Sequence, residues 1–217
     1  IRPFENNIKN KRLIIIPDGE LGYLSFDMLL SERPAVDHES YTDLMWLIRE
    51  YPVSYSSSAT IFFEQISREP KRVKKSLLAF APSYDFAAKY RDATLADSIL
   101  LNLSPMVGTE EEVNAISELF PAKIRMDDQA TETYFKNHAG DYNILHLAMH
   151  TIVDDQNPLY SKLVFTPDPD NAIDDGYLNT YELFNLNLPG QLAVLSACNT
   201  GSGKLERGEG ILSLARG

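Results

Sequence analysis

The sequence of 217 residues has little of what marks several common classes of protein. Its single cysteine excludes an internal disulfide framework and is typical of a reducing compartment. No uninterrupted apolar run approaches the ~20 residues that a membrane-spanning helix needs. The first residues, Ile1 to Phe4, contain neither a methionine nor a signal-peptide pattern. We therefore expect a cytoplasmic domain of a longer protein, without a membrane partner.

Positive charge is also scarce. The sequence has 31 acidic residues and only 20 basic ones, so the net charge is −11 and the isoelectric point is about 4.8. Nucleic-acid affinity comes mostly from cationic groups on phosphates, so this balance argues against direct nucleic-acid binding. The local basic cluster at 71–75 is interpreted as a solvated connector. The acidic loop at 166–176 lacks the ligand spacing of a calcium-binding helix–loop–helix.

Strand and helix patterns alternate after residue 76. The expected strands are almost continuously apolar, which is typical of strands covered on both faces. This pattern predicts a three-layer α/β fold with a mainly parallel sheet flanked by helices. The charged stretch at 69–75 is the predicted boundary between a smaller α/β subdomain, residues 1–70, and the main core, residues 71–217.

The individual elements are predicted from apolar periodicity and turn residues. Strands are expected at 13–16, 53–55, 76–81, 122–126, 143–150, 163–165 and 192–198. Helices are expected at 41–50, at 109–120 and at 179–183. A further helix, capped by Ser57 or Ser58, is expected to run to about residue 68, and another to run from Asp128 or Thr131 to about residue 140. Residues 83–107 are expected to be irregular or partly helical. Capping boxes are predicted for the pairs Thr109/Glu112 and Asn179/Glu182.

Two of the apolar runs end in residues that can do chemistry. One run ends at His150 and the other at Cys198, 48 positions later (150 to 198). Ligand sites of open parallel sheets lie beyond the carboxyl ends of the strands, so neighbouring strands would deliver both side chains to one edge. Little of a free thiol, with a pKa near ~8.5, is thiolate at neutral pH, and a nearby imidazole can take its proton. Each residue alone is more typical of an inert core; the pair predicts a nucleophile and its base.

Competing motifs fail on particular residues. His146 and His150 are spaced like the histidines of a zinc protease, but that motif needs a glutamate where Leu147 stands and a helix where a strand is expected. His146 is instead expected to be buried support. The stretch from Gly201 to Lys204 is similar to part of a phosphate-binding loop. That motif, however, needs a glycine where Cys198 stands and a serine or threonine where Leu205 stands. We expect no metal and no cofactor.

Four groups of segments stand out, in this order along the chain: Leu13-Ile-Ile-Ile-Pro-Asp-Gly19 with Leu24-Ser-Phe26, His146-Leu-Ala-Met-His150, Asp175-Gly-Tyr-Leu178 with Glu182-Leu183, and Leu195-Ser-Ala-Cys-Asn-Thr-Gly201 with Gly208-Glu-Gly210 and Leu214-Ala-Arg216. Caspase-type peptidases place the histidine ~50 residues before an Ala-Cys pair, as at Ala197 and Cys198. Together the segments make the sequence resemble a CHAT domain, the caspase-like family akin to separase and often attached to TPR repeats in bacterial proteins.

The resemblance implies a cysteine endopeptidase with a His–Cys dyad. Cys198 corresponds to the nucleophile and His150 to the catalytic histidine. The oxyanion donors would be the backbone N–H groups of Cys198 and Thr151, although the family usually has glycine where this chain has Thr151. Asn199 and Gly201, in the loop that begins at Cys198, are candidate substrate-cleft residues. Asp154 and Asp155, which follow the strand of His150, are candidates as well, but two such acidic residues are more typical of a solvated loop.

The resemblance also implies partners. We expect a protein substrate, and upstream TPR repeats or an activating protein that reorders the loops. Family members continue past the point that corresponds to Gly217, so part of the fold is expected to be missing, through truncation or cleavage. The alternative to an enzyme is an inactive caspase-like scaffold or interaction domain.

Overall fold

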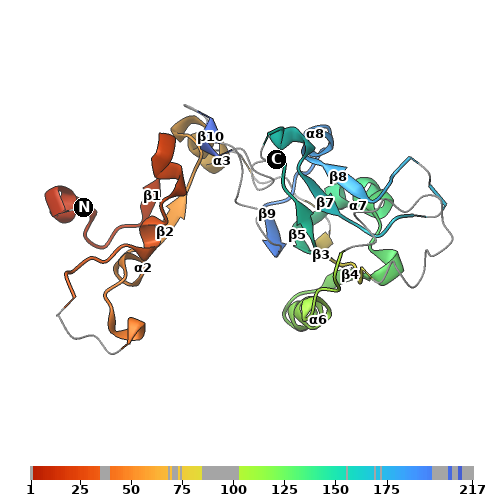
Figure 1. Cartoon of the computed structure of the whole chain (residues 1–217), viewed down its shortest axis with the longest axis horizontal. Coiled ribbons are helices and arrows are strands. Elements are labelled where there is room, and N and C mark those ends of the chain that lie inside the picture. The colour runs from red at the N-terminus through yellow and green to blue at the C-terminus, as the bar shows by residue number, and fades with distance from the viewer. Residues whose placement is uncertain are drawn as a thin grey trace. The chain divides into compact units, whose positions relative to one another are not determined.

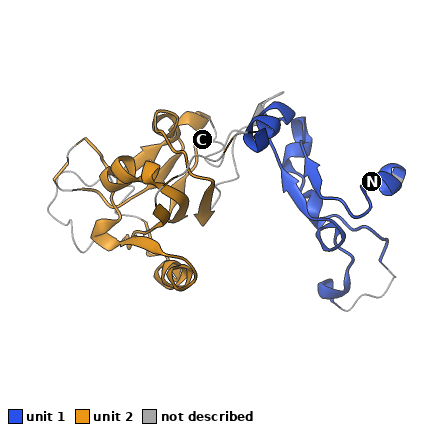
Figure 2. Ribbon diagram, turned by 180° about the vertical axis from the view of Figure 1, so that it is seen from behind, with its two compact units in different colours: residues 1–68, 205–212 blue, residues 69–204, 213–217 orange. Residues whose placement is uncertain are grey.

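The structure is a computed structural model. It describes residues 2–34, 40–67, 69, 73, 75–84, 103–154, 156–168, 170–171, 173–196, 205–206 and 210–211. The chain divides into two compact units, one of residues 1–68 and 205–212 and the other of residues 69–204 and 213–217 (Figure 2).

The first unit contains short elements. In chain order they are η1 Arg2–Phe4, α1 Glu5–Ile8, β1 Leu13–Ile15, η2 Gly19–Tyr23, η3 Phe26–Met28, η4 Tyr41–Asp43, α2 Leu47–Glu50, β2 Val53–Tyr55, α3 Ala59–Ser67, β10 Leu205–Glu206 and β11 Gly210–Ile211. Strands β1 and β2 pair in parallel, and β10 and β11 pair in antiparallel fashion. The two strands predicted in this part of the chain are therefore confirmed.

The helix predicted over residues 41–50 is wrong in its extent. Helix α2 begins only at Leu47, because the backbone before it pairs with another segment instead of continuing a helix. Leu30 and Trp46 form an antiparallel bridge, and the Leu47 N–H donates to the carbonyl of Leu29 at 2.7 Å. The predicted cap of α3 is confirmed, since Ser58 Oγ accepts from the N–H of Ile61.

A four-stranded parallel sheet forms the centre of the second unit (Figure 1). Its strands are β3 Lys75–Ala81, β4 Ala122–Met126, β5 Tyr142–Ala148 and β9 Leu192–Ser196, in the order β4-β3-β5-β9. All three neighbouring pairs are parallel. The predicted mainly parallel sheet is thus confirmed.

Layers of different kinds cover the two faces of this sheet. Helix α6, Thr109–Leu119, packs on the face that carries Leu77, Ala79 and Ala148. The other face carries Leu78 and Phe80. It is covered by α7 Glu132–His138, by the antiparallel sheet β6 Thr151–Ile152, β7 Lys162–Val164 and β8 Tyr177–Asn179, and by the helix α8 Thr180–Leu183. Short 3-10 turns, η5 Asp127–Gln129, η6 Ala139–Asp141 and η7 Pro158–Tyr160, connect these elements.

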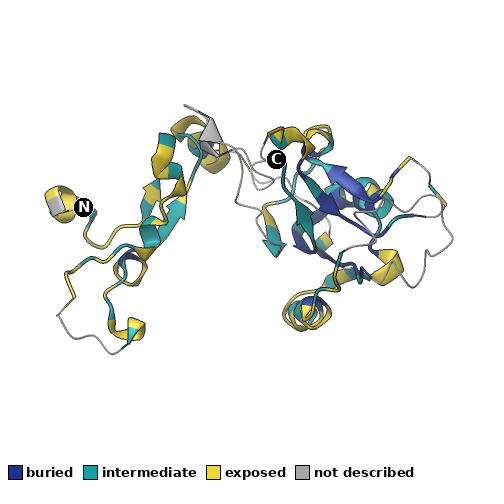
Figure 3. Cartoon of the chain, in the orientation of Figure 1, coloured by how far each residue is buried: buried dark blue, intermediate teal, exposed yellow. Residues whose placement is uncertain are grey.

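The main core lies on this second face (Figure 3). The rings of Phe80, Phe135 and Phe165 meet edge to face or tilted, with centroids 5.3 to 5.7 Å apart. Such aromatic contacts add to the free energy gained by burial alone. The sheet with helices on both sides is the three-layer α/β architecture expected from the sequence.

One of the two predicted capping boxes is present. Asn179 and Glu182 cap α8 reciprocally, as predicted. The box predicted for α6 is wrong: Gly108, at φ 92°, is the N-cap residue, and the Thr109 hydroxyl donates to the carbonyl of Met106. The Glu112 side chain does not reach back to the helix start, because it finds hydrogen-bond partners on the sheet.

Candidate active site

The two strands that lead to His150 and Cys198 are neighbours. Strands β5 and β9 pair in parallel, and the last residues in register are Ala148 and Ser196. Each lies two positions before the predicted site residue of its own strand. The condition on which the predicted pair depends, adjacent strands leading to one edge of the sheet, is therefore met. Cys198 itself lies outside the described residues, as do Asn199, Gly201 and Asp155.

The imidazole of His150 has a fixed polar partner. Its Nε2 atom lies 2.7 Å from the carbonyl oxygen of Ser104. A carbonyl can only accept, so Nε2 must carry the proton. In the neutral ring this leaves Nδ1 as the proton acceptor. The contact with Ser104 thus selects the tautomer in which one ring nitrogen can act as a base.

Tyr84 contacts His150 through both its ring and its hydroxyl group. Its ring lies against the imidazole, with centroids 4.5 Å apart, and its hydroxyl accepts the backbone N–H of His150 at 2.7 Å. The same hydroxyl donates to the carbonyl of Val164 at 2.7 Å. Burial raises the pKa of Tyr84 far above its usual value, so the hydroxyl keeps the proton that it donates.

Strand β7 completes this support, since the N–H of Val164 donates to the carbonyl of His150 at 3.0 Å. The backbone of His150 is therefore held on both its N–H and its carbonyl. Tyr84 is not among the predicted site residues, because it falls in the stretch 83–107 that is expected to lack regular structure. Its position just after the buried strand β3, at the carboxyl edge of the parallel sheet, is the feature that could have identified it.

Two further predicted site residues follow His150. Thr151 is half-buried in β6 and pairs with Leu163 of β7. Asp154 uses its Oδ1 atom to accept the N–H groups of Gln156 and Asn157, at 3.0 and 2.8 Å. This carboxylate oxygen therefore shapes the loop that follows β6. Their roles toward a substrate stay predictions.

A second polar cluster lies between the sheet and α6. His146 is only 5% exposed, as expected for buried support, and its Nε2 atom lies 2.8 Å from Oε1 of Glu112. The hydroxyl of Ser196 donates to Oε2 of the same carboxylate at 3.1 Å. One side chain from the first turn of α6 therefore contacts both strands that lead to the predicted dyad.

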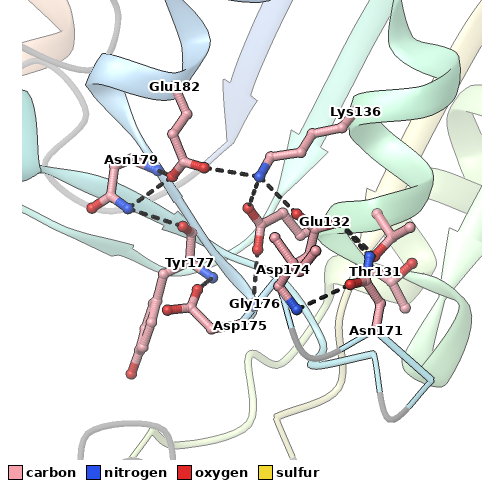
Figure 4. Close-up of polar contacts among 12 residues, drawn as sticks. Thr131, Glu132, Lys136, Asn171, Asp174, Asp175, Gly176, Tyr177, Asn179 and Glu182 are labelled. Carbon is pink, nitrogen blue, oxygen red and sulfur yellow. Dashed lines mark hydrogen bonds and ion pairs between the residues drawn. The ribbon is translucent and has the colours of Figure 1, made fainter.

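A third cluster surrounds Lys136 on α7 (Figure 4). Its ammonium nitrogen lies 2.6 Å from Glu132, 2.8 Å from Asp174 and 2.8 Å from Glu182. Burial opposes the charge on Lys136, but its hydrogen bonds to the three carboxylates outweigh burial and raise its pKa. Burial also opposes charge on Asp174 and Glu182, yet the bonds from Lys136 and from neighbouring donors lower the pKa of both carboxyl groups.

This cluster fixes the segment that enters β8. Glu132 accepts the N–H of Gly176 at 2.9 Å, and the N–H of Phe165 donates to the Gly176 carbonyl at 2.7 Å. Burial is the largest influence on Glu132 and raises the pKa of its carboxyl group in spite of Lys136. The cluster therefore holds β8 next to β7, which in turn holds the backbone of His150.

The described residues contain no group of three or more histidine, cysteine or acidic side chains that could hold a metal ion. None of the helices described is long and apolar enough to cross a membrane.

A parallel sheet covered on both faces, with a histidine and a cysteine following adjacent strands, is consistent with the caspase-like α/β fold expected from the sequence. The CHAT domain family matches residues 1–217, and the chain belongs to that family, which is generally related to caspase-like peptidases. A search of curated proteins finds no match to this chain.

Proposed function

We propose that this domain is a cysteine endopeptidase in which Cys198 is the nucleophile and His150 the general base and acid. The observation that carries the proposal is the register of β5 and β9, which leads both strands to these residues after the same number of positions. The hydrogen bond from His150 to Ser104 supports it, because it leaves Nδ1 as the proton acceptor.

In the proposed reaction Nδ1 of His150 takes the thiol proton of Cys198, and the thiolate attacks the carbonyl carbon of a peptide bond. The oxyanion that forms is stabilised by the backbone N–H groups of Cys198 and Thr151. Collapse of this intermediate breaks the C–N bond, and the imidazolium protonates the leaving amine. Water, deprotonated by His150, then hydrolyses the thioester and regenerates the thiol.

The surroundings of His150 suit this cycle. The carbonyl of Ser104 faces the N–H of the ring and stabilises the imidazolium that forms after each proton transfer. The bonds from Tyr84 and Val164 hold the backbone in place, so the ring keeps its position while its charge changes. Positioning of this kind lowers the reorganisation that the reaction requires.

The substrate of the proposed enzyme is a protein. The substrate cleft of the enzyme would contain Asp154, Asp155, Asn199 and Gly201. Acidic residues at 154 and 155 would favour a basic side chain before the scissile bond. Activation by upstream TPR repeats or by a partner protein, in the cytoplasm of a bacterium, belongs to the same proposal. No cofactor takes part in the steps above.

Thr151 favours one alternative, a caspase-like scaffold that binds proteins without cleaving them. The family usually has glycine at this position, and a side chain here narrows the space around a substrate carbonyl. In this alternative the fold presents its loops to a partner and Cys198 is inert.

The experiment that separates the two functions is labelling of the activated full-length protein with a peptide carrying an electrophilic ketone. We expect Cys198 to be labelled in the wild type, and labelling to be lost in Cys198→Ala and strongly reduced in His150→Ala. His138→Ala is the matched control, because that histidine bonds the carbonyl of Tyr134, away from the predicted dyad. Equal labelling of the wild type and Cys198→Ala would rule out the proposed nucleophile.

A further inference from the structure

We propose that Glu112 is a positioning residue of the candidate active site, whose carboxylate couples the two strands that lead to His150 and Cys198. The proposal rests on the cysteine-peptidase function proposed above. It adds a residue from α6, an element that contributes nothing to the dyad itself.

The two oxygens of the Glu112 carboxylate serve different strands. Oε1 lies 2.8 Å from Nε2 of His146 on β5, and Oε2 accepts from the hydroxyl of Ser196 on β9 at 3.1 Å. Both hydrogen bonds form at the same time, because each uses its own oxygen. A single side chain therefore bridges two neighbouring parallel strands from outside the sheet.

The bridge lies at the carboxyl end of the pairing that the structure describes between the two strands. Ser196 is in register with Ala148, and this is the last described pair. His150 and Cys198 follow two residues later along the chain. The hydrogen bonds of Glu112 at this point limit how far the carboxyl ends of β5 and β9 can move apart. Misplacement of reacting groups by about 1 Å can lower a rate by about a hundredfold.

The surroundings of Glu112 favour its hydrogen bond with His146. Glu112 is half-buried beside the hydrophobic cluster of this face, which consists of Leu77, Ala79, Ala81, Val113 and Ala148. A buried imidazole among such neighbours is unfavourable unless it is paired, and Glu112 is its partner. The carboxylate also lies in the first turn of an 11-residue helix, where the unpaired N–H groups favour negative charge.

The test measures the rate at which iodoacetamide alkylates Cys198 at neutral pH in the full-length protein, quantified by mass spectrometry of the peptide that contains it. The rate follows the thiolate fraction and therefore depends on a correctly placed base. We expect Glu112→Ala to lower the rate about tenfold, well within the cost of a misplaced group. Glu111→Ala, an exposed neighbour in the same turn, is expected to react like the wild type.

Glu112→Gln supplies the conservative rescue. Its amide oxygen can still accept from Ser196, and its NH₂ group can donate to the other tautomer of His146. Most of the wild-type rate is therefore expected to return. Ser196→Ala removes one of the two bonds with little change in volume. It is expected to give a smaller loss than Glu112→Ala, and it provides the test if Glu112→Ala does not fold.

The outcomes separate the two proposals. If Glu112→Ala is less stable in urea but alkylates at the wild-type rate, Glu112 only stabilises the fold and the inference is overturned. A wild-type rate in Ser196→Ala, where Glu112→Ala fails to fold, overturns it as well. In both cases, slow alkylation of Cys198 in the His150→Ala variant would still support the proposed dyad. If His150→Ala alkylates as fast as the wild type, the dyad itself fails and the positioning role fails with it.

Discussion

The hydroxyl of Tyr84 accepts the backbone N–H of His150 at 2.7 Å. Because the same hydroxyl donates to Val164, one buried oxygen joins the ends of three strands: β3, through Tyr84, β5, through His150, and β7. Tyr84 is 2% exposed, so water cannot easily replace these bonds. The position of the proposed general base is thus set by a residue distant in sequence.

Tyr84→Phe is expected to leave the N–H of His150 and the carbonyl of Val164 without this partner. The loss of a buried hydrogen-bonding group costs about 1–3 kcal/mol of unfolding free energy. Urea unfolding measures the cost, and Tyr41→Phe, an 81% exposed tyrosine, is the control with no expected effect. Labelling of Cys198 by the electrophilic peptide should fall in the same variant. Unchanged stability and unchanged labelling would contradict a supporting role for Tyr84.

Lys136→Met is expected to destabilise the second unit by at least about 2 kcal/mol, because it leaves Glu132, Asp174 and Glu182 close together without a cation. The lysine side chain is 23% exposed, so the cost falls below that of a fully buried pair. Lys123→Met, an exposed lysine on β4, should change stability by less than about 0.5 kcal/mol. Similar urea midpoints for the two variants would contradict the importance of the cluster.

Acid should weaken the same cluster. The folded protein lowers the pKa of Asp174 and Glu182, so their contribution is fully present above their unfolded values of about 3.9 and 4.3. It is lost as the pH falls from there through the lowered folded values. Asp174→Asn is expected to be less stable than the wild type at pH 7, with the difference shrinking toward pH 3. Parallel stability curves for the two proteins would contradict this assignment.

Gly176→Ala tests the turn into β8. Gly176 has φ +90°, and a Cβ there would lie 3.1 Å from the carbonyl oxygen of Phe165. Gly108 has a similar φ of +92° with open space around its Cβ position, and so provides the control for backbone strain alone. We expect Gly176→Ala to cost about 1–2 kcal/mol more than Gly108→Ala in urea unfolding. Equal costs would show that the close approach to Phe165 is unimportant.

Local signals predicted some elements well and others poorly. The continuous apolar strands of the second unit were found because their burial on both faces leaves a plain pattern. In the first unit, Leu44 to Ile48 have helical spacing, but the bridge between Leu30 and Trp46 takes the backbone away from a helix. Pairing between distant segments is not visible in a local pattern.

The candidate site divides in the same way. The sequence alone determined that a histidine and the only cysteine follow two apolar strands, because strand ends and residue types are local properties. Only the tertiary structure decided that these strands are neighbours in matched register. It also decided that Ser104 and Tyr84 hold His150, and that Glu112 leaves its predicted capping position for His146 and Ser196. The physical reason is that buried polar groups take partners from whichever segment the fold brings close.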